Sequence, residues 1–140
     1  MIGNRGAARV LVVDDDVDSA EFLAEALRAG GYSPTVLFSG SAAIAKLERQ
    51  TFDAVITDLH MPEVDGLRVL EASRAFDPLR PVIIVTACEA PASAIKAHDN
   101  GVFQYVSKPL RVESVLKVLS RALSADEGNL QRSRAPTFFV

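Results

Sequence analysis

The sequence has few of the features that mark secreted, membrane or nucleic-acid-binding proteins. Its 140 residues include one cysteine, Cys88, and no tryptophan. A disulfide within the chain is therefore excluded, and a cytoplasmic location is expected. No run of about 18 apolar residues is present, which excludes a membrane-spanning helix. The 15 basic and 18 acidic residues give a net charge of −3, so we expect no membrane partner and no direct contact with nucleic acid.

The composition is that of a globular protein. Hydrophobic residues make up 49% of the chain and charged residues 24%, a balance that allows a buried core. The length predicts a single domain. We expect this domain to occupy residues 1–124, with residues 125–140 as a C-terminal tail or linker whose output domain is absent.

Short apolar runs alternate with helical patterns along the chain. Strands are predicted at residues 10–13, 53–57 and 81–86, with weaker candidates at 35–38 and 104–106. The first three runs are continuous and rich in valine and isoleucine, which is typical of strands covered on both faces, as in a parallel sheet. Strands that alternate with helices predict a three-layer α/β sandwich.

Capping and breaking residues predict where five helices lie. The predicted starts are Asp18 for the first helix, Ser39-Gly40 for the second, Asp65-Gly66 for the third, Pro91 (to about Asn100) for the fourth and Val112 for the fifth. Asp18 is expected to act as an N-cap with Glu21 as its partner. We expect Phe22 on the buried face of the first helix, and Val118, which lies off the apolar stripe of the fifth, to be exposed.

Acidic and polar residues stand where the predicted strands end. Asp14 and Asp15 follow the first strand, Asp58 follows the third, Thr86 ends the fourth, and Lys108 follows the fifth. In an open parallel sheet, ligands bind beyond the carboxyl ends of the strands, where the strand order reverses. If the first and third predicted strands are neighbours, these groups share one crevice.

Such a group of side chains suits a metal ion and a phosphoryl group. Two carboxylates about 4 Å apart repel each other by roughly 4 kcal/mol at an effective dielectric constant of about 20. A divalent cation with oxygen ligands, above all Mg²⁺, removes this repulsion. The cation and a lysine together would neutralise phosphoryl oxygens, and a carboxylate can act as the nucleophile.

Five short motifs, in this order along the chain, extend the pattern over about residues 9–123. They are Val12-Val13-Asp14-Asp15, Thr57-Asp58-Leu59-His60-Met61-Pro62, Asp65-Gly66, Val85-Thr86-Ala87 and Lys108-Pro109. With these motifs the sequence resembles the response-regulator receiver domains of two-component signal transduction. The resemblance implies a flavodoxin-like (βα)5 fold with a five-stranded parallel sheet in the order 2-1-3-4-5.

The resemblance also implies a function as a phosphorylation-activated signalling switch. Asp58 matches the residue that accepts a phosphoryl group from a sensor histidine kinase or phosphotransfer protein. Asp15, Asp58 and the backbone carbonyl of His60 match the ligands of Mg²⁺, or of Mn²⁺ in its place, while Asp14 matches an acid that holds the metal through water. The chain would catalyse only its own phosphorylation and slow dephosphorylation, and would not be an enzyme with an independent substrate.

Further residues match the switch machinery of the family. Lys108 matches the lysine that binds the phosphoryl oxygens, and Thr86 matches the hydroxyl that moves toward them. Tyr105 matches the aromatic side chain that changes rotamer with Thr86, and Ala87 matches a small residue that leaves access to the site. The Lys108–Pro109 bond matches a bond that is cis in the family.

Two other functions fit parts of the pattern. The spacing of Asp14 and Asp16 also fits an aspartate-nucleophile phosphatase of similar layering. A receiver-like module that works by protein contact, without phosphorylation, is the second alternative. A homodimer through the fourth helix, fifth strand and fifth helix is a further expectation, for which an exposed Val118 is the only indication.

Overall fold

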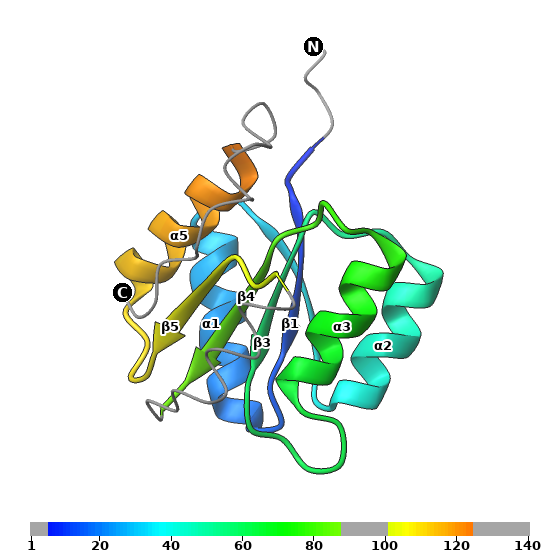
Figure 1. Ribbon diagram of the computed structural model, residues 1–140. Helices are drawn as coiled ribbons and strands as arrows, with labels where there is room; N and C mark the ends of the chain where they lie inside the picture. The colour runs from blue at the N-terminus through cyan, green and yellow to red at the C-terminus, as the bar shows by residue number, and fades with distance from the viewer. Residues whose placement is uncertain (1–5, 88–100, 125–140) are drawn as a thin grey trace.

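The protein is a parallel sheet covered by helices on both faces (Figure 1). The structure, a computed structural model, describes residues 6–87 and 101–124. The five strands run in the order β2-β1-β3-β4-β5, and every neighbouring pair is parallel. They are β1 (Arg9–Val13), β2 (Ser33–Leu37), β3 (Ala54–Asp58), β4 (Val82–Thr86) and β5 (Gln104–Ser107). The predicted flavodoxin-like fold class and strand order are confirmed.

Two helices lie on each face of the sheet in the part of the chain that is described (Figure 1). They are α1 (Val17–Ala29) and α5 (Val112–Ser124) on one face, and α2 (Gly40–Arg49) and α3 (Gly66–Phe76) on the other. The predicted fourth helix, about Pro91 to Asn100, lies outside the described residues, as do Cys88 and the expected tail, residues 125–140. No helix of the described residues has both the length and the apolar character needed to cross a membrane.

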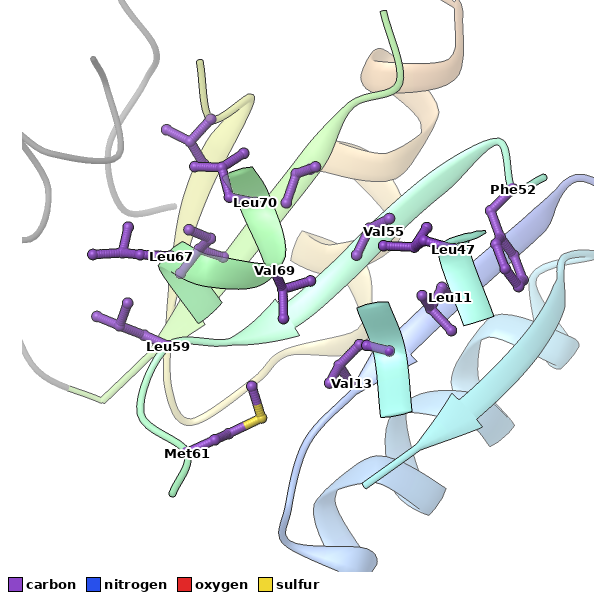
Figure 2. Close-up of a cluster of buried hydrophobic side chains, with 14 of the residues drawn as sticks. Leu11, Val13, Leu47, Phe52, Val55, Leu59, Met61, Leu67, Val69 and Leu70 are labelled. Atoms are coloured by element: carbon purple, nitrogen blue, oxygen red, sulfur yellow. The ribbon is translucent and has the colours of Figure 1, made fainter. Parts of the chain in front are cut away.

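Alternate residues of the central strands supply two separate cores. Leu11, Val13 and Val55 pack with α2 and α3 in the first core (Figure 2). Val12 and Ile56 point to the other face and pack with α1 and α5. These five side chains are at most 1% exposed. Strands buried on both faces are apolar at most positions on either face, which explains the continuous runs in the sequence.

The start of α1 differs from the prediction. Asp16, and not Asp18, is the N-cap: its Oδ1 accepts a hydrogen bond of 3.1 Å from the Asp18 N–H. The Asp16 Oδ2 atom also accepts from the Ser19 hydroxyl at 3.0 Å. Asp18 lies in the first turn, where its N–H is one of the donors that a cap must satisfy. The predicted starts of α2 and α3 are confirmed, and Ser39 and Asp65 are their N-caps.

Two predictions about helix faces are wrong. Val118 is 1% exposed and packs in the core under α5, because Val115, Val118, Leu119 and Ala122 form the buried stripe of that helix. Its burial removes the sequence indication for a homodimer. Phe22 is 53% exposed, since α1 buries the neighbouring positions of its helical repeat, including Leu23.

Candidate functional site

The sheet order brings the acidic residues of two distant motifs together. β1 and β3 are neighbours, with Val13 beside Thr57 in the register. Asp14 follows β1 directly, and Asp58 is the last residue of β3. One carboxylate oxygen each from Asp14, Asp15 and Asp58 lie within 4.8 Å of one another. The predicted cluster of three carboxylates is therefore present at the carboxyl edge of the sheet.

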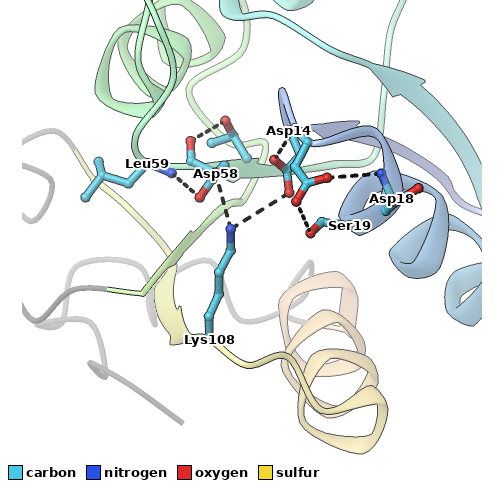
Figure 3. A network of polar contacts seen from close by, with 8 residues as sticks. Asp14, Asp18, Ser19, Asp58, Leu59 and Lys108 are labelled. Carbon is cyan, nitrogen blue, oxygen red and sulfur yellow. Dashed lines mark hydrogen bonds and ion pairs between the residues drawn. The ribbon is translucent and has the colours of Figure 1, made fainter.

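A lysine from the far side of the crevice completes the cluster. The Lys108 Nζ atom lies 3.4 Å from Asp58 Oδ2 and 4.0 Å from Asp14 Oδ2 (Figure 3). Its backbone is anchored to the neighbouring strand, because the Lys108 N–H donates to the Thr86 carbonyl at 2.9 Å. The Lys108–Pro109 peptide bond is cis, as predicted. Residues from three strand ends thus converge on one point.

Asp14 is the most deeply buried acid of the cluster, with an exposed fraction of 7%. Burial raises the pKa of Asp14 above its usual value, and the charges of Asp58 and Asp15 raise it further. A hydrogen bond of 3.0 Å from the Asp16 N–H to Asp14 Oδ1 and the Lys108 ammonium group oppose this shift. The raised pKa therefore reflects first the loss of solvent around Asp14 and second the carboxylates beside it.

The two carboxylate oxygens of Asp58 have different surroundings. Oδ1 accepts a hydrogen bond of 3.0 Å from the Leu59 N–H, while Oδ2 faces Lys108 (Figure 3). The residue is partly exposed. An incoming group can therefore reach an acid whose orientation is set by the backbone on one side and by a cation on the other.

Thr86 and Tyr105 are buried in β4 and β5, the two strands next to β3 on the Lys108 side of the sheet. Thr86 ends β4 and is 1% exposed, and the following residue, Ala87, is exposed. Tyr105 pairs with Ile84 in the sheet, is 1% exposed, and belongs to the core on the α2 and α3 face. Burial raises the pKa of the Tyr105 hydroxyl to about 12, so this group stays protonated at neutral pH.

The loop after Asp58 carries the backbone carbonyl that the family resemblance assigns to the metal. His60 is exposed, whereas Met61 is buried and anchors the loop in the core. Glu63 has a φ of 69°, a left-handed conformation that is costly for a residue with a side chain. The loop returns to the strand through the Gly66 N–H, which donates to the Leu59 carbonyl at 2.8 Å.

One polar residue beside the site received no role from the sequence. Thr57 is fully buried in β3, and its hydroxyl donates to the Asp58 carbonyl oxygen at 2.9 Å. The only local signal is a polar residue within an otherwise apolar strand. A buried hydroxyl needs a partner, but the identity of that partner depends on the side-chain conformation, which the pattern does not encode.

The donor set fits a hard divalent cation. Asp14, Asp15 and Asp58 offer only oxygen ligands, which Mg²⁺ and Mn²⁺ prefer to nitrogen or sulfur. Asp15 is exposed and Asp58 partly exposed, which leaves room for the water ligands that Mg²⁺ usually keeps. The acidic cluster could therefore bind a metal ion beside the lysine.

Comparison with known proteins shows which family the chain resembles. The family model described as the response regulator receiver domain matches residues 10–120. The "Transcriptional regulatory protein ZraR" of Salmonella typhimurium is 36% identical over 86% of this chain and 27% of its own length. The "DNA-binding transcriptional regulator NtrC" of Klebsiella pneumoniae is 34% identical over 89% of this chain, again 27% of its length. The chain thus spans about a quarter of these curated relatives.

The fold is shared with a solved receiver domain. The response regulator receiver domain protein (CheY-like) from Methanospirillum hungatei JF-1 superposes with a TM-score of 0.84 at 24% identity, over 88% of this chain and 98% of that one. The family model covers most of the chain and includes every residue of the acidic cluster and Lys108. The chain therefore belongs to the response-regulator receiver domain family of two-component signal transduction, a class of phosphorylation-activated signalling switches.

Proposed function

We propose that Asp58 is the phosphoacceptor of this receiver domain. A receiver domain implies a sensor kinase as its partner, and the donor would be a phosphohistidine of that kinase or of a phosphotransfer protein. One Asp58 carboxylate oxygen forms a bond to phosphorus, the histidine N–P bond breaks, and its electron pair stays on the imidazole nitrogen. The main support for this proposal is that Asp58 lies beside two further carboxylates and Lys108 at the carboxyl edge of the sheet.

Mg²⁺ is the proposed cofactor, held by Asp15, Asp58 and the His60 carbonyl, with Asp14 acting through water; Mn²⁺ would serve in its place. A bound divalent ion supplies positive charge to the phosphoryl oxygens as they approach the carboxylates. The support is the oxygen-only donor set, three carboxylates within 4.8 Å of one another. Lys108 would supply the second positive charge, since it already lies 3.4 Å from Asp58.

The response to phosphorylation would pass through Thr86 and Tyr105. An acyl phosphate adds about 1.5 to 2 negative charges and several hydrogen-bond acceptors. The Thr86 hydroxyl, at the end of the neighbouring strand, would move toward these oxygens, and the Tyr105 ring would change rotamer with it. Ala87, a small and exposed residue, would leave access to the site.

The chain would not act on an independent substrate. An aspartate-nucleophile phosphatase would need Asp16 as its acid–base, two residues after Asp14. Both carboxylate oxygens of Asp16 instead hold the first turn of α1, through the Asp18 N–H and the Ser19 hydroxyl. This structural use of Asp16 favours self-catalysed phosphorylation and slow dephosphorylation over phosphatase chemistry.

Incubation with acetyl phosphate and Mg²⁺, followed by intact-mass measurement, tests the proposal. The wild-type chain should gain one phosphate mass, and chelation of the metal should prevent the gain. Asp58→Asn should gain none. Asp16→Asn is the matched control, since asparagine is an equally good N-cap, and it should react like the wild type. An adduct that persists in Asp58→Asn, or no adduct on the wild type, would contradict the assignment.

A further inference from the structure

The peptide group between Asp58 and Leu59 is held on both of its polar atoms. Its carbonyl oxygen accepts a 2.9 Å hydrogen bond from the Thr57 hydroxyl. Its N–H, on Leu59, donates to the Val85 carbonyl at 2.9 Å and to the Asp58 carboxylate Oδ1 at 3.0 Å. Because a peptide group is planar, rotation of the carbonyl away from Thr57 would also turn the N–H away from the carboxylate.

A glycine packs against the same peptide group. A Cβ atom on Gly66 would lie 2.3 Å from the Asp58 carbonyl oxygen and 3.0 Å from Leu59 Cα. The Gly66 N–H also donates to the Leu59 carbonyl at 2.8 Å. The backbone of α3 therefore closes the space beside this carbonyl, and the Thr57 hydroxyl supplies the donor that satisfies it.

We propose that Thr57 is a positioning residue for the phosphoacceptor. Its hydroxyl holds the carbonyl end of the 58–59 peptide plane, while Val85 holds the N–H end. The plane keeps the Leu59 N–H on Asp58 Oδ1, and the other oxygen, Oδ2, faces Lys108. The Thr57 hydroxyl contacts the backbone carbonyl of Asp58 and not its carboxylate, so its effect on the phosphoacceptor is indirect. The inference rests on the proposed function and adds a residue to it.

The role belongs to the hydroxyl and not to the volume of the side chain. Valine has nearly the same shape as threonine and a high strand propensity, so Thr57→Val keeps the packing of β3 and removes only the donor. Serine keeps the donor and removes a methyl group. Because Thr57 is fully buried, no water can take the place of the lost hydrogen bond without a rearrangement of the core.

The test compares Thr57→Val with Thr57→Ser. The rate of adduct formation from acetyl phosphate should fall by about fivefold to tenfold in Thr57→Val, the cost of one lost hydrogen bond, and stay within about twofold of wild type in Thr57→Ser. Thr35→Val, in β2 and away from the site, is the matched control and should react at the wild-type rate. Urea unfolding of each variant establishes that the protein is folded during the assay.

A second measurement does not depend on phosphorylation. Amide hydrogen exchange at Leu59, followed by NMR, should be about fivefold faster or more in Thr57→Val than in the wild type, and unchanged in Thr57→Ser. A wild-type reaction rate and wild-type Leu59 exchange in Thr57→Val would overturn the positioning role. Equal losses in the valine and serine variants would also overturn it, because packing would then be the cause. If the wild type takes no phosphate, the proposed function fails, while the Leu59 exchange still decides the role of Thr57.

Discussion

The Lys108 ammonium nitrogen lies 3.4 Å from the Asp58 carboxylate oxygen Oδ2, although 50 positions separate the two residues in the chain. The same nitrogen is 4.0 Å from Asp14 Oδ2. Lys108 therefore contacts two of the carboxylates that would hold a metal ion. The positive charges of Lys108 and the metal ion would repel each other, but both would attract an incoming phosphate. Substitution of Lys108 should therefore affect metal binding and phosphorylation in opposite directions.

Replacement of Lys108 by alanine should separate metal binding from phosphorylation. Lys108→Ala should slow adduct formation by about tenfold or more, because a cation that stabilises the transferring phosphoryl oxygens is lost. It should also tighten Mg²⁺ binding by about threefold, since one competing positive charge disappears. Mass time courses and calorimetric titration with Mg²⁺ measure the two effects. Lys117→Ala, an exposed lysine on α5, should change neither, and an unchanged reaction rate in Lys108→Ala would refute its role.

Binding of Mg²⁺ should stabilise the fold through the acidic cluster. A ligand at ten times its dissociation constant raises the free energy of unfolding by about 1.4 kcal/mol. Asp15→Asn should abolish this gain, because it removes the charge of one of the proposed metal ligands. Asp18→Asn, on the same segment but outside the cluster, should keep it. Urea unfolding with and without Mg²⁺ provides the measurement, and a full gain in Asp15→Asn would contradict the proposed ligand set.

The raised pKa of Asp14 predicts a pH-dependent stability change. Since the folded state binds the proton more tightly than the unfolded state, ionised Asp14 destabilises the fold at neutral pH, and this cost disappears as the pH falls through the raised pKa. Without Mg²⁺, Asp14→Asn should be more stable than the wild type near pH 7, with a smaller gain near pH 4. Urea unfolding at both pH values measures the gain. A gain that does not vary with pH would show that ionisation of Asp14 is not its cause. Asp16→Asn is the control for the loss of a neighbouring carboxylate outside the cluster.

The left-handed backbone of Glu63 predicts that glycine improves the loop after Asp58. With a φ of 69°, Glu63→Gly should stabilise the fold by about 0.5 to 1 kcal/mol, because glycine adopts this conformation without steric cost. Glu25→Gly, at an exposed position within α1, should instead destabilise by about 1 kcal/mol. Urea unfolding measures whether each variant gains or loses stability relative to the wild type. A loss of stability in both variants would mean that the loop does not strain Glu63.

The strands could be predicted from the sequence because a buried strand consists largely of consecutive apolar residues. β1, β3 and β4 are covered on both faces, and their runs are apolar without a break, so the parallel sheet and the residues at its carboxyl edge could be identified. The helix faces were harder to predict. Val118 lies off an apolar stripe that starts at Val112, but Val112 is 36% exposed and the buried stripe of α5 begins at Val115.

The sequence pattern also does not predict which residue caps α1 or which hydrogen bonds form near the site. Asp16 and Asp18 are both good N-cap residues, and only the path of the chain after β1 decides that Asp16 takes this position. Thr57 could be recognised as a polar residue in an apolar strand, but its bond to the Asp58 carbonyl depends on one rotamer. Such choices are made by packing that involves several elements at once.

The amino-acid order alone determined which chemical groups stand at the strand ends: Asp14, Asp15, Asp58, Thr86 and Lys108. Only the tertiary structure decided that the three carboxylates and Lys108 meet, because the order β2-β1-β3-β4-β5 places β1 beside β3 and brings Lys108 across β4 to within 3.4 Å of Asp58. The physical reason is that burial has a period along the chain, whereas contact between distant strands depends on how the whole sheet is assembled.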